Sequence, residues 1–199
     1  MELILASKSP RRRELLSDAG YSFRIFVSEA DETLPPEIAP AEGVKLLAER
    51  KAKAVESSLT PDILRSAPVY VIGADTLVEL NGVPLGKPKD EADAEAMLTA
   101  LSGNRHHVVT GVAVAVGGKI FSGVETTAVT FRPLSKEEIA EYVASGEPMD
   151  KAGAYGIQAG AVRFVQKVDG ELDNVIGLPR KLLAKLLREA GYGTGKETP

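Results

Sequence analysis

The sequence contains no cysteine and only two histidines, which are neighbours at His106 and His107. The lack of cysteine excludes disulfides, thiolate metal sites and a cysteine nucleophile. Two adjacent histidines cannot build a multi-histidine metal site, so any bound metal must be held mainly by oxygen, which favours Mg²⁺, Mn²⁺ or Ca²⁺. No histidine-based triad is in view for Ser7 or Ser9, so serine-nucleophile chemistry is not expected.

Long apolar runs and an excess of positive charge are also lacking. No run approaches the roughly 20 apolar residues of a membrane span, and the opening MELILASK turns polar too soon for a signal peptide. We therefore expect a cytoplasmic protein with no membrane partner. The net charge is -4, and no basic and aromatic residues interleave in a patch, so a nucleic-acid partner is not expected.

The 199 residues are 44% hydrophobic and 26% charged, which is ordinary globular composition. We expect a single domain over residues 1–192 and a disordered tail over 193–199. Periodicity with turn and cap residues predicts strands at 2–5, 21–28, 69–75 and 161–168, hairpins at 76–86 and 106–131, and helices at 10–19, 44–57, 91–101, 135–145 and from Pro179 to Gly191. Ser9 and Asp90 are predicted N-caps, and Ser135 with Glu138 is a predicted capping box. Because hairpins interrupt the alternation of helices and strands, the prediction is α/β with a mixed, twisted sheet.

Three arginines, Arg11, Arg12 and Arg13, follow Ser9-Pro10 at a predicted helix start. Positive charge is unfavourable there, because a helix N-terminus already carries about half a positive charge. Unpaired backbone N–H groups and guanidinium forks together suit a phosphate group. The alternative is an ordinary capped helix with a solvated basic face. Because no GxxxxGK[ST] stretch is present, this is not a Walker loop.

The stretch VIGADT delivers Asp75 and Thr76 at the end of an apolar strand, where ligands bind in open α/β sheets. An aspartate there can hold a divalent metal or orient a water, or it can simply cap the turn into the hairpin. Lys87 follows that hairpin, either at a site or as a surface lysine. The acidic loop with Glu29, Asp31 and Glu32 could reach a metal or remain solvated.

Two further segments carry polar side chains that could serve a site. In the helix LLAERKAKA, at most one of Lys51 and Lys53 can face a site. The glycine-rich segment GEPMDKAGAYGIQAGA permits close backbone approach and carries Gln158, whose amide suits reading a nucleobase edge. A long structural turn is the alternative. Cations with helix N-termini, and carboxylates without histidine, together favour metal-assisted attack of water on a polyphosphate.

Taken together, these motifs resemble the Maf family of nucleoside triphosphate pyrophosphatases. The matching stretches run in the family's order over nearly the whole chain: ASKSPRRREL (6–15), DET (31–33), LAERKA (47–52), GADT (73–76), GKP (86–88), LSGNRHHVVTGV (101–112), GEPMDKAGAYGIQ (146–158) and NVIGLP (174–179). The resemblance implies an elongated, two-lobed α/β fold around a central cleft, similar to inosine triphosphate pyrophosphatases.

The resemblance also implies an activity, namely hydrolysis of a nucleotide to its monophosphate and pyrophosphate in a house-cleaning role. It makes Asp75 the general base and a metal contact, and Glu32 a second carboxylate for Mg²⁺ or Mn²⁺. It assigns Arg12, Lys51 and Lys87 to binding of the triphosphate.

Substrate choice is implied by three positions, Arg11, Thr76 and Gln158, which match the subgroup acting on dTTP and UTP. Modified pyrimidine nucleotides are further candidate substrates. The subgroup acting on 7-methyl-GTP resembles SPWR at the first position and lacks GIQ. The one departure from the pattern is the extra arginine, Arg13.

Several alternatives stay open at this point. The family has been linked to inhibition of septum formation, so a regulatory partner-binding protein with weak or no catalysis is the rival reading. Nothing in the residues alone separates α–β cleavage from release of orthophosphate. The sequence also leaves the oligomeric state open, a homodimer included.

Overall fold

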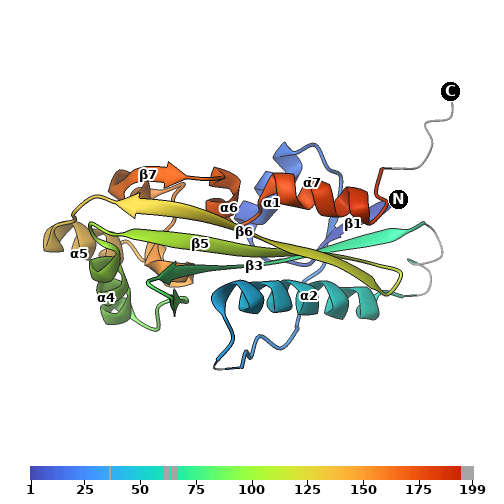
Figure 1. Ribbon diagram of the computed structural model, residues 1–199, viewed down its shortest axis with the longest axis horizontal. Coiled ribbons are helices and arrows are strands. Elements are labelled where there is room, and N and C mark those ends of the chain that lie inside the picture. The colour runs from blue at the N-terminus through green and yellow to red at the C-terminus, as the bar shows by residue number, and fades with distance from the viewer. Residues whose placement is uncertain (36, 61–62, 64–66, 194–199) are drawn as a thin grey trace. The chain divides into compact units, whose positions relative to one another are not determined.

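The computed structural model describes residues 1–35, 37–60, 63 and 67–193 (Figure 1). The chain divides into two compact units. Unit 1 comprises residues 1–75, 110–125 and 177–199, and unit 2 comprises residues 76–109 and 126–176. The tail expected to be disordered lies, apart from Gly193, outside the described residues.

Seven strands of the described chain form one sheet in the order β2-β1-β3-β5-β6-β7, with β4 paired to β3. The strands are β1 (Glu2–Leu5), β2 (Arg24–Ile25), β3 (Val69–Leu80), β4 (Val83–Leu85), β5 (Arg105–Val116), β6 (Lys119–Phe131) and β7 (Val165–Asp169). β1 is parallel to β2 and β3, whereas the pairs β3–β4 and β6–β7 are antiparallel. The sheet is therefore mixed, and the predicted α/β class is confirmed.

Most helices of the described residues begin within one residue of the predicted start. They are α1 (Pro10–Asp18), α2 (Pro40–Ser58), α4 (Glu91–Leu101), α5 (Lys136–Ala144), α6 (Leu172–Ile176) and α7 (Arg180–Glu189), with short 3₁₀ turns η1 (Glu147–Asp150), η2 (Ala152–Ala154) and η3 (Gly160–Phe164). Ser9 caps α1 by accepting a hydrogen bond from the Arg12 amide, and Asp90 caps α4 through the Asp93 amide. Each cap satisfies a backbone donor that the helix itself leaves unpaired.

Three of the predicted elements need correction. The strand predicted at 21–28 shrinks to Arg24–Ile25, because β2 is a sheet edge with an exposed backbone and only β1 beside it. The strand predicted at 161–168 begins only at Val165, after the 3₁₀ turn of η3. Helix α2 starts four residues early, since Pro40 is a favourable first residue. The short helix α6 was not predicted.

In unit 1, α2 packs against one face of the sheet (Figure 1). Side chains alternate between the two faces along a strand, so Val69 and Val71 share the face toward α2, where they pack with Ala48 and Ala52. At Gly73, on the same face, an added Cβ would lie 2.1 Å from the Ala48 carbonyl oxygen. Only glycine allows the helix and strand to come this close.

A second glycine in unit 1 allows a close contact with α7. In β6, a Cβ at Gly123 would lie 2.9 Å from Leu182 Cδ1. Helix α7 buries Leu183, Leu186 and Leu187 along one stripe, as an amphipathic surface helix does. In Figure 1, α7 lies on the opposite side of the sheet from α2. The sheet of unit 1 is therefore covered by a helix on each face.

Unit 2 is built on an aromatic core. Phe131 packs edge-on to Tyr155 and Phe164, with ring centroids 4.8 and 6.0 Å apart, and Tyr142 of α5 packs edge-on to Phe164 at 5.2 Å. All of these rings are almost fully buried. Edge-to-face contacts of this kind stabilise a core beyond the area they bury.

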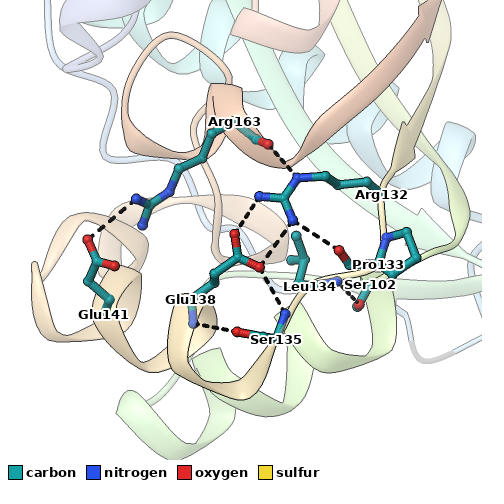
Figure 2. A network of polar contacts seen from close by, with 8 residues as sticks. All are labelled: Ser102, Arg132, Pro133, Leu134, Ser135, Glu138, Glu141 and Arg163. Atoms are coloured by element: carbon teal, nitrogen blue, oxygen red, sulfur yellow. Dashed lines mark hydrogen bonds and ion pairs between the residues drawn. The ribbon is translucent and has the colours of Figure 1, made fainter.

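A polar network ties the start of α5 to the end of β6 (Figure 2). Ser135 and Glu138 form the predicted capping box, which is confirmed. Figure 2 shows the guanidinium of Arg132 lying between the Glu138 carboxylate and the backbone carbonyl of Arg163. The hydrogen bonds from Arg132, with one from the Ser135 amide, lower the pKa of Glu138 to about 2. The network thus fixes where α5 begins.

His106 is buried in the aromatic core and not at a surface site. Its Nε2 lies 2.9 Å from the Tyr155 hydroxyl, and its ring packs edge-on to Phe131 at 4.9 Å. Burial lowers the pKa of His106 to about 4, against a weaker opposing effect of the Asn104 backbone. The imidazole is therefore neutral at physiological pH and serves the core.

We predict that His106 makes the protein less stable in mild acid. Between about pH 6.5 and 4 the unfolded chain binds a proton at this position that the folded chain does not, so stability present above pH 6.5 falls by up to about 3 kcal/mol as the pH drops toward 4. NMR titration of the imidazole signals tests this prediction, with the partly exposed His107 as internal control. A His106 signal that titrates near pH 6.5 in the folded protein would contradict it.

Candidate functional site

Asp75 stands at the point where β3 leaves unit 1, on the sheet face that α2 covers. Val71, Gly73 and Asp75 point to the same face, because side chains in a strand alternate. On α2, Lys51 lies one turn from Ala48, whose carbonyl oxygen is the atom closest to Gly73. The glycine that lets the helix approach the strand therefore also brings Lys51 to Asp75.

The ammonium of Lys51 lies between two carboxylates. Its Nζ is 2.6 Å from Asp75 Oδ1 and 2.9 Å from Glu32 Oε1. The side chains of Lys51 and Asp75 are only 13% and 18% exposed, whereas that of Glu32 is 65% exposed. The inner pair is poorly screened by water and correspondingly strong, while Glu32 closes the cluster from the solvent side.

The loop that carries Glu32 is held by the residue next to Lys51. Arg50 Nη1 donates hydrogen bonds to the carbonyl oxygens of Asp31 and Thr33, at 3.2 and 2.6 Å. The Asp31 carboxylate accepts a hydrogen bond from the Thr33 amide at 2.9 Å, which makes a tight turn. Arg50 thus holds the backbone on both sides of Glu32, and the adjacent Lys51 pairs with the Glu32 carboxylate.

Sequence reasoning missed the role of Arg50. The available signal was its place beside Lys51 in LAERKA, but nothing in that stretch shows that it reaches a loop 17 to 19 residues away. The same reasoning expected at most one of Lys51 and Lys53 to face a site. In the structure Lys53 is exposed, whereas Lys51 is half-buried and pairs with Asp75.

The guanidinium of Arg12 donates hydrogen bonds to the backbone of unit 1. Its Nε donates to the Gly177 carbonyl at 2.8 Å, and its Nη1 donates to the Ala74 carbonyl at 2.9 Å. Burial lowers the pKa of Arg12, while the charge of Asp75 opposes that shift. The arginine thus joins the start of α1 to the residue just before Asp75 and to the turn that precedes α7.

The other predicted site residues are divided between the two units. Arg11 is half-buried in the first turn of α1, in unit 1. Thr76, Lys87 and Gln158 belong to unit 2, where Thr76 continues β3 and Lys87 and Gln158 are exposed. The structure therefore brings together Arg12, Glu32, Lys51 and Asp75 within unit 1.

The donor set of this cluster suits a hard cation but is small. Among the residues that the structure describes, no three His, Asp or Glu side chains gather as a group that could hold a metal ion. Two carboxylates, Glu32 and Asp75, do meet on one ammonium. Mg²⁺ is commonly held by one or two carboxylates together with waters and substrate phosphates, so this pair fits such an ion.

Comparison with known proteins gives near full-length matches. A family model described as Maf-like protein matches residues 2–190. A protein of Geobacillus sp. (strain WCH70), named dTTP/UTP pyrophosphatase, is 48% identical over 96% of this chain and 99% of its own length. One of Desulfitobacterium hafniense (strain Y51) with the same name is 50% identical over 97% of this chain and 87% of its own.

A more distant likeness is to a solved structure, that of the Staphylococcus aureus Ham1 protein. It aligns with 96% of this chain and 100% of that chain, at 17% identity and a TM-score of 0.49. The structure itself adds that no helix among its described residues is both long and apolar enough to cross a bilayer.

We predict that Gly73→Ala destabilises the protein by about 2 kcal/mol or more, because its Cβ has no room beside the backbone of α2. The matched control is Gly86→Ala, where a Cβ meets nothing within 4 Å, and a change within about 0.5 kcal/mol is expected. Urea denaturation with unchanged m values measures both. Equal stability of the two variants would contradict the close approach.

Proposed function

The chain belongs to the Maf family, and on that premise we propose that it is a nucleoside triphosphate pyrophosphatase that hydrolyses dTTP and UTP to the monophosphate and pyrophosphate. Modified pyrimidine nucleotides are further candidate substrates, and the role is house-cleaning of the nucleotide pool. The observation that carries the proposal is the cluster of Asp75, Lys51 and Glu32 at the end of a buried strand. It combines a base, a cation and a second carboxylate.

Asp75 is the proposed general base. Its carboxylate lies in a part-buried position and accepts a hydrogen bond from Lys51, so it is oriented before substrate arrives. A water within hydrogen-bond distance of Asp75 can give it a proton while attacking the phosphorus. The proton then rests on the carboxylate, and pyrophosphate leaves as the anion.

Phosphate binding is assigned to cations. The Lys51 ammonium can turn from the carboxylates to a phosphate oxygen, because a lysine donates up to three hydrogen bonds. Arg12 adds positive charge at the N-terminus of α1, where backbone amides already favour an anion. A third cation, the exposed Lys87 of unit 2, is also proposed to bind the triphosphate. Substrate choice is assigned to Arg11, Thr76 and Gln158.

A divalent cation, Mg²⁺ or Mn²⁺, is proposed to join the substrate, with Glu32 and Asp75 as its protein ligands. Bound there, it would neutralise charge on the phosphates and lower the pKa of a water. The Glu32–Asp75 pair is suited to this because both are oxygen donors and already share one positive charge, that of Lys51.

We predict that Asp75→Asn lowers kcat by at least about a hundredfold, since the amide cannot accept the proton. The assay incubates each variant with single nucleoside triphosphates and Mg²⁺ or Mn²⁺ and identifies the products by chromatography. Monophosphate with pyrophosphate from dTTP and UTP is expected from the unaltered protein.

Two results would count against the proposal. Diphosphate with orthophosphate would overturn the cleavage position while keeping the site. Turnover of no nucleotide by the folded protein would overturn the activity and favour a partner-binding role in cell division.

We also predict that Arg50→Met raises the Mg²⁺ concentration for half-maximal activity about fivefold, because the loop that presents Glu32 loses two hydrogen bonds. Lys53→Met is the matched control, an exposed cation of the same helix. Titration of activity against Mg²⁺ measures both variants. A lower kcat with an unchanged Mg²⁺ requirement would show that Arg50 does not act through Glu32.

A further inference from the structure

Gln158 lies in the middle of a short segment whose two ends are fixed by side chains. The backbone amide of Gly156 donates to the Tyr142 hydroxyl at 3.2 Å, and the amide of Gly160 donates to Glu147 Oε2 at 3.1 Å. Within the segment, the Ala159 amide donates to the Gly156 carbonyl at 3.3 Å, which closes a turn. Both ends of the Gln158 segment are thus attached to residues of α5 and η1.

The two side chains that hold the segment are bonded to each other. The Tyr142 hydroxyl donates to Glu147 Oε1 at 2.8 Å. Burial, and then the hydrogen bond to Glu147, raise the pKa of Tyr142 above its ordinary value, so the hydroxyl keeps the proton that it donates. A continuous chain of three hydrogen bonds therefore runs from Gly156 through Tyr142 and Glu147 to Gly160.

The backbone of Glu147 is held as well. Its amide donates to Ser145 Oγ at 3.2 Å, and its carbonyl accepts a hydrogen bond from Lys151 Nζ at 2.6 Å. Lys151 also contacts the Asp150 carboxylate at 2.7 Å. Both backbone polar groups of Glu147, whose carboxylate holds Gly160, are therefore hydrogen-bonded.

Packing around the segment leaves little room for another conformation. A Cβ at Gly156 would lie 2.7 Å from Lys151 Cε, and one at Gly160 would lie 3.1 Å from Tyr142 Cε2. Ile157 is 9% exposed and packs in the core of unit 2. With its neighbour turned inward, Gln158 is left exposed, as a residue that reads a ligand must be.

We propose that Tyr142 and Glu147 are positioning residues for substrate choice, because they hold the segment in which Gln158 meets the pyrimidine base. This rests on the proposed function, and specifically on the assignment of Gln158 to base recognition. A side chain that reads a base edge must be held still, since each hydrogen bond is lost by a small displacement. Neither Tyr142 nor Glu147 touches the base in this account.

The test compares the variants Tyr142→Phe and Glu147→Gln in the intact protein. Tyr142→Phe removes the hydroxyl, and Glu147→Gln leaves one acceptor oxygen where the carboxylate offers two, both with little change in volume. We expect the ratio of kcat/KM for UTP to that for ATP to fall about three- to tenfold in each, through KM more than kcat. Glu141→Gln is the matched control, because Glu141 lies on the same helix and its carboxylate pairs with the exposed Arg163 at 3.4 Å.

The double variants with Gln158→Ala decide whether the effect passes through Gln158. If it does, Tyr142→Phe and Glu147→Gln change the selectivity no further once Gln158 is removed. Unchanged selectivity in the single variants, or an equal further loss in the Gln158→Ala background, would overturn the proposal. So would an active Gln158→Ala variant with normal selectivity, which would leave the proposed hydrolysis standing.

A second measurement does not depend on turnover. Backbone amide exchange, followed by NMR without nucleotide, is expected to speed up several-fold at Gly156 in Tyr142→Phe and at Gly160 in Glu147→Gln. Unchanged protection at both amides would overturn the positioning role. An unaltered protein that hydrolyses no nucleotide would instead overturn the proposed function, and the assignment to substrate choice with it.

Discussion

The ammonium of Lys51, held between Asp75 and Glu32, is the interaction on which unit 1 depends. A full charge on a side chain that is only 13% exposed costs desolvation free energy unless opposite charges lie against it. The two carboxylates supply them, and the ammonium in turn allows two like charges to stay close. Removing Lys51 would leave two carboxylates facing each other, and removing Asp75 would leave a part-buried ammonium with only the exposed Glu32. The cluster is therefore a structural centre of unit 1, at the residues proposed to carry the chemistry.

The close packing of α2 on the sheet makes this cluster possible. Gly73 and Gly111 both face α2 where a Cβ would meet its backbone, at 2.1 and 2.3 Å from carbonyl oxygens. Two contacts along the helix set its distance from the sheet near both Val44 and Ala48. That distance also brings Lys51 to Asp75, because Lys51 lies on the same face of the helix. Two glycines, by letting α2 approach the sheet, therefore determine where Lys51 meets Asp75.

Local signals in the sequence were enough for most of the fold. The caps at Ser9, Asp90 and Ser135, and the mixed sheet, followed from patterns within a few residues of each element. β2 was overestimated because alternation in YSFRIFVS suggests a strand but does not tell how little backbone it pairs. The start of β7 was missed because AVRFVQKV reads as one β-rich run, while Gly160–Phe164 winds into a 3₁₀ turn.

For the site, the sequence could name candidate residues but not their partners. Asp75 and Lys51 were candidates from their places on a strand and a helix, and the family resemblance gave them roles. Their contact came from the packing of α2. Arg12 illustrates the limit. Charge placement suggested an awaited anion, whereas its guanidinium also holds two carbonyl groups, at Ala74 and Gly177. Contacts between residues 62 and 165 positions apart are not written in any local pattern.

The unequal exposure of the two carboxylates would affect ion selectivity at the proposed metal site. Asp75 is fixed in a buried strand, whereas Glu32 hangs on a surface loop that Arg50 holds by its backbone. A cation between one rigid and one compliant ligand can be larger or smaller without disturbing the sheet, because only the loop has to move. Such a pair would tell Mg²⁺ from Mn²⁺ less by radius than by the waters and phosphates that each ion brings.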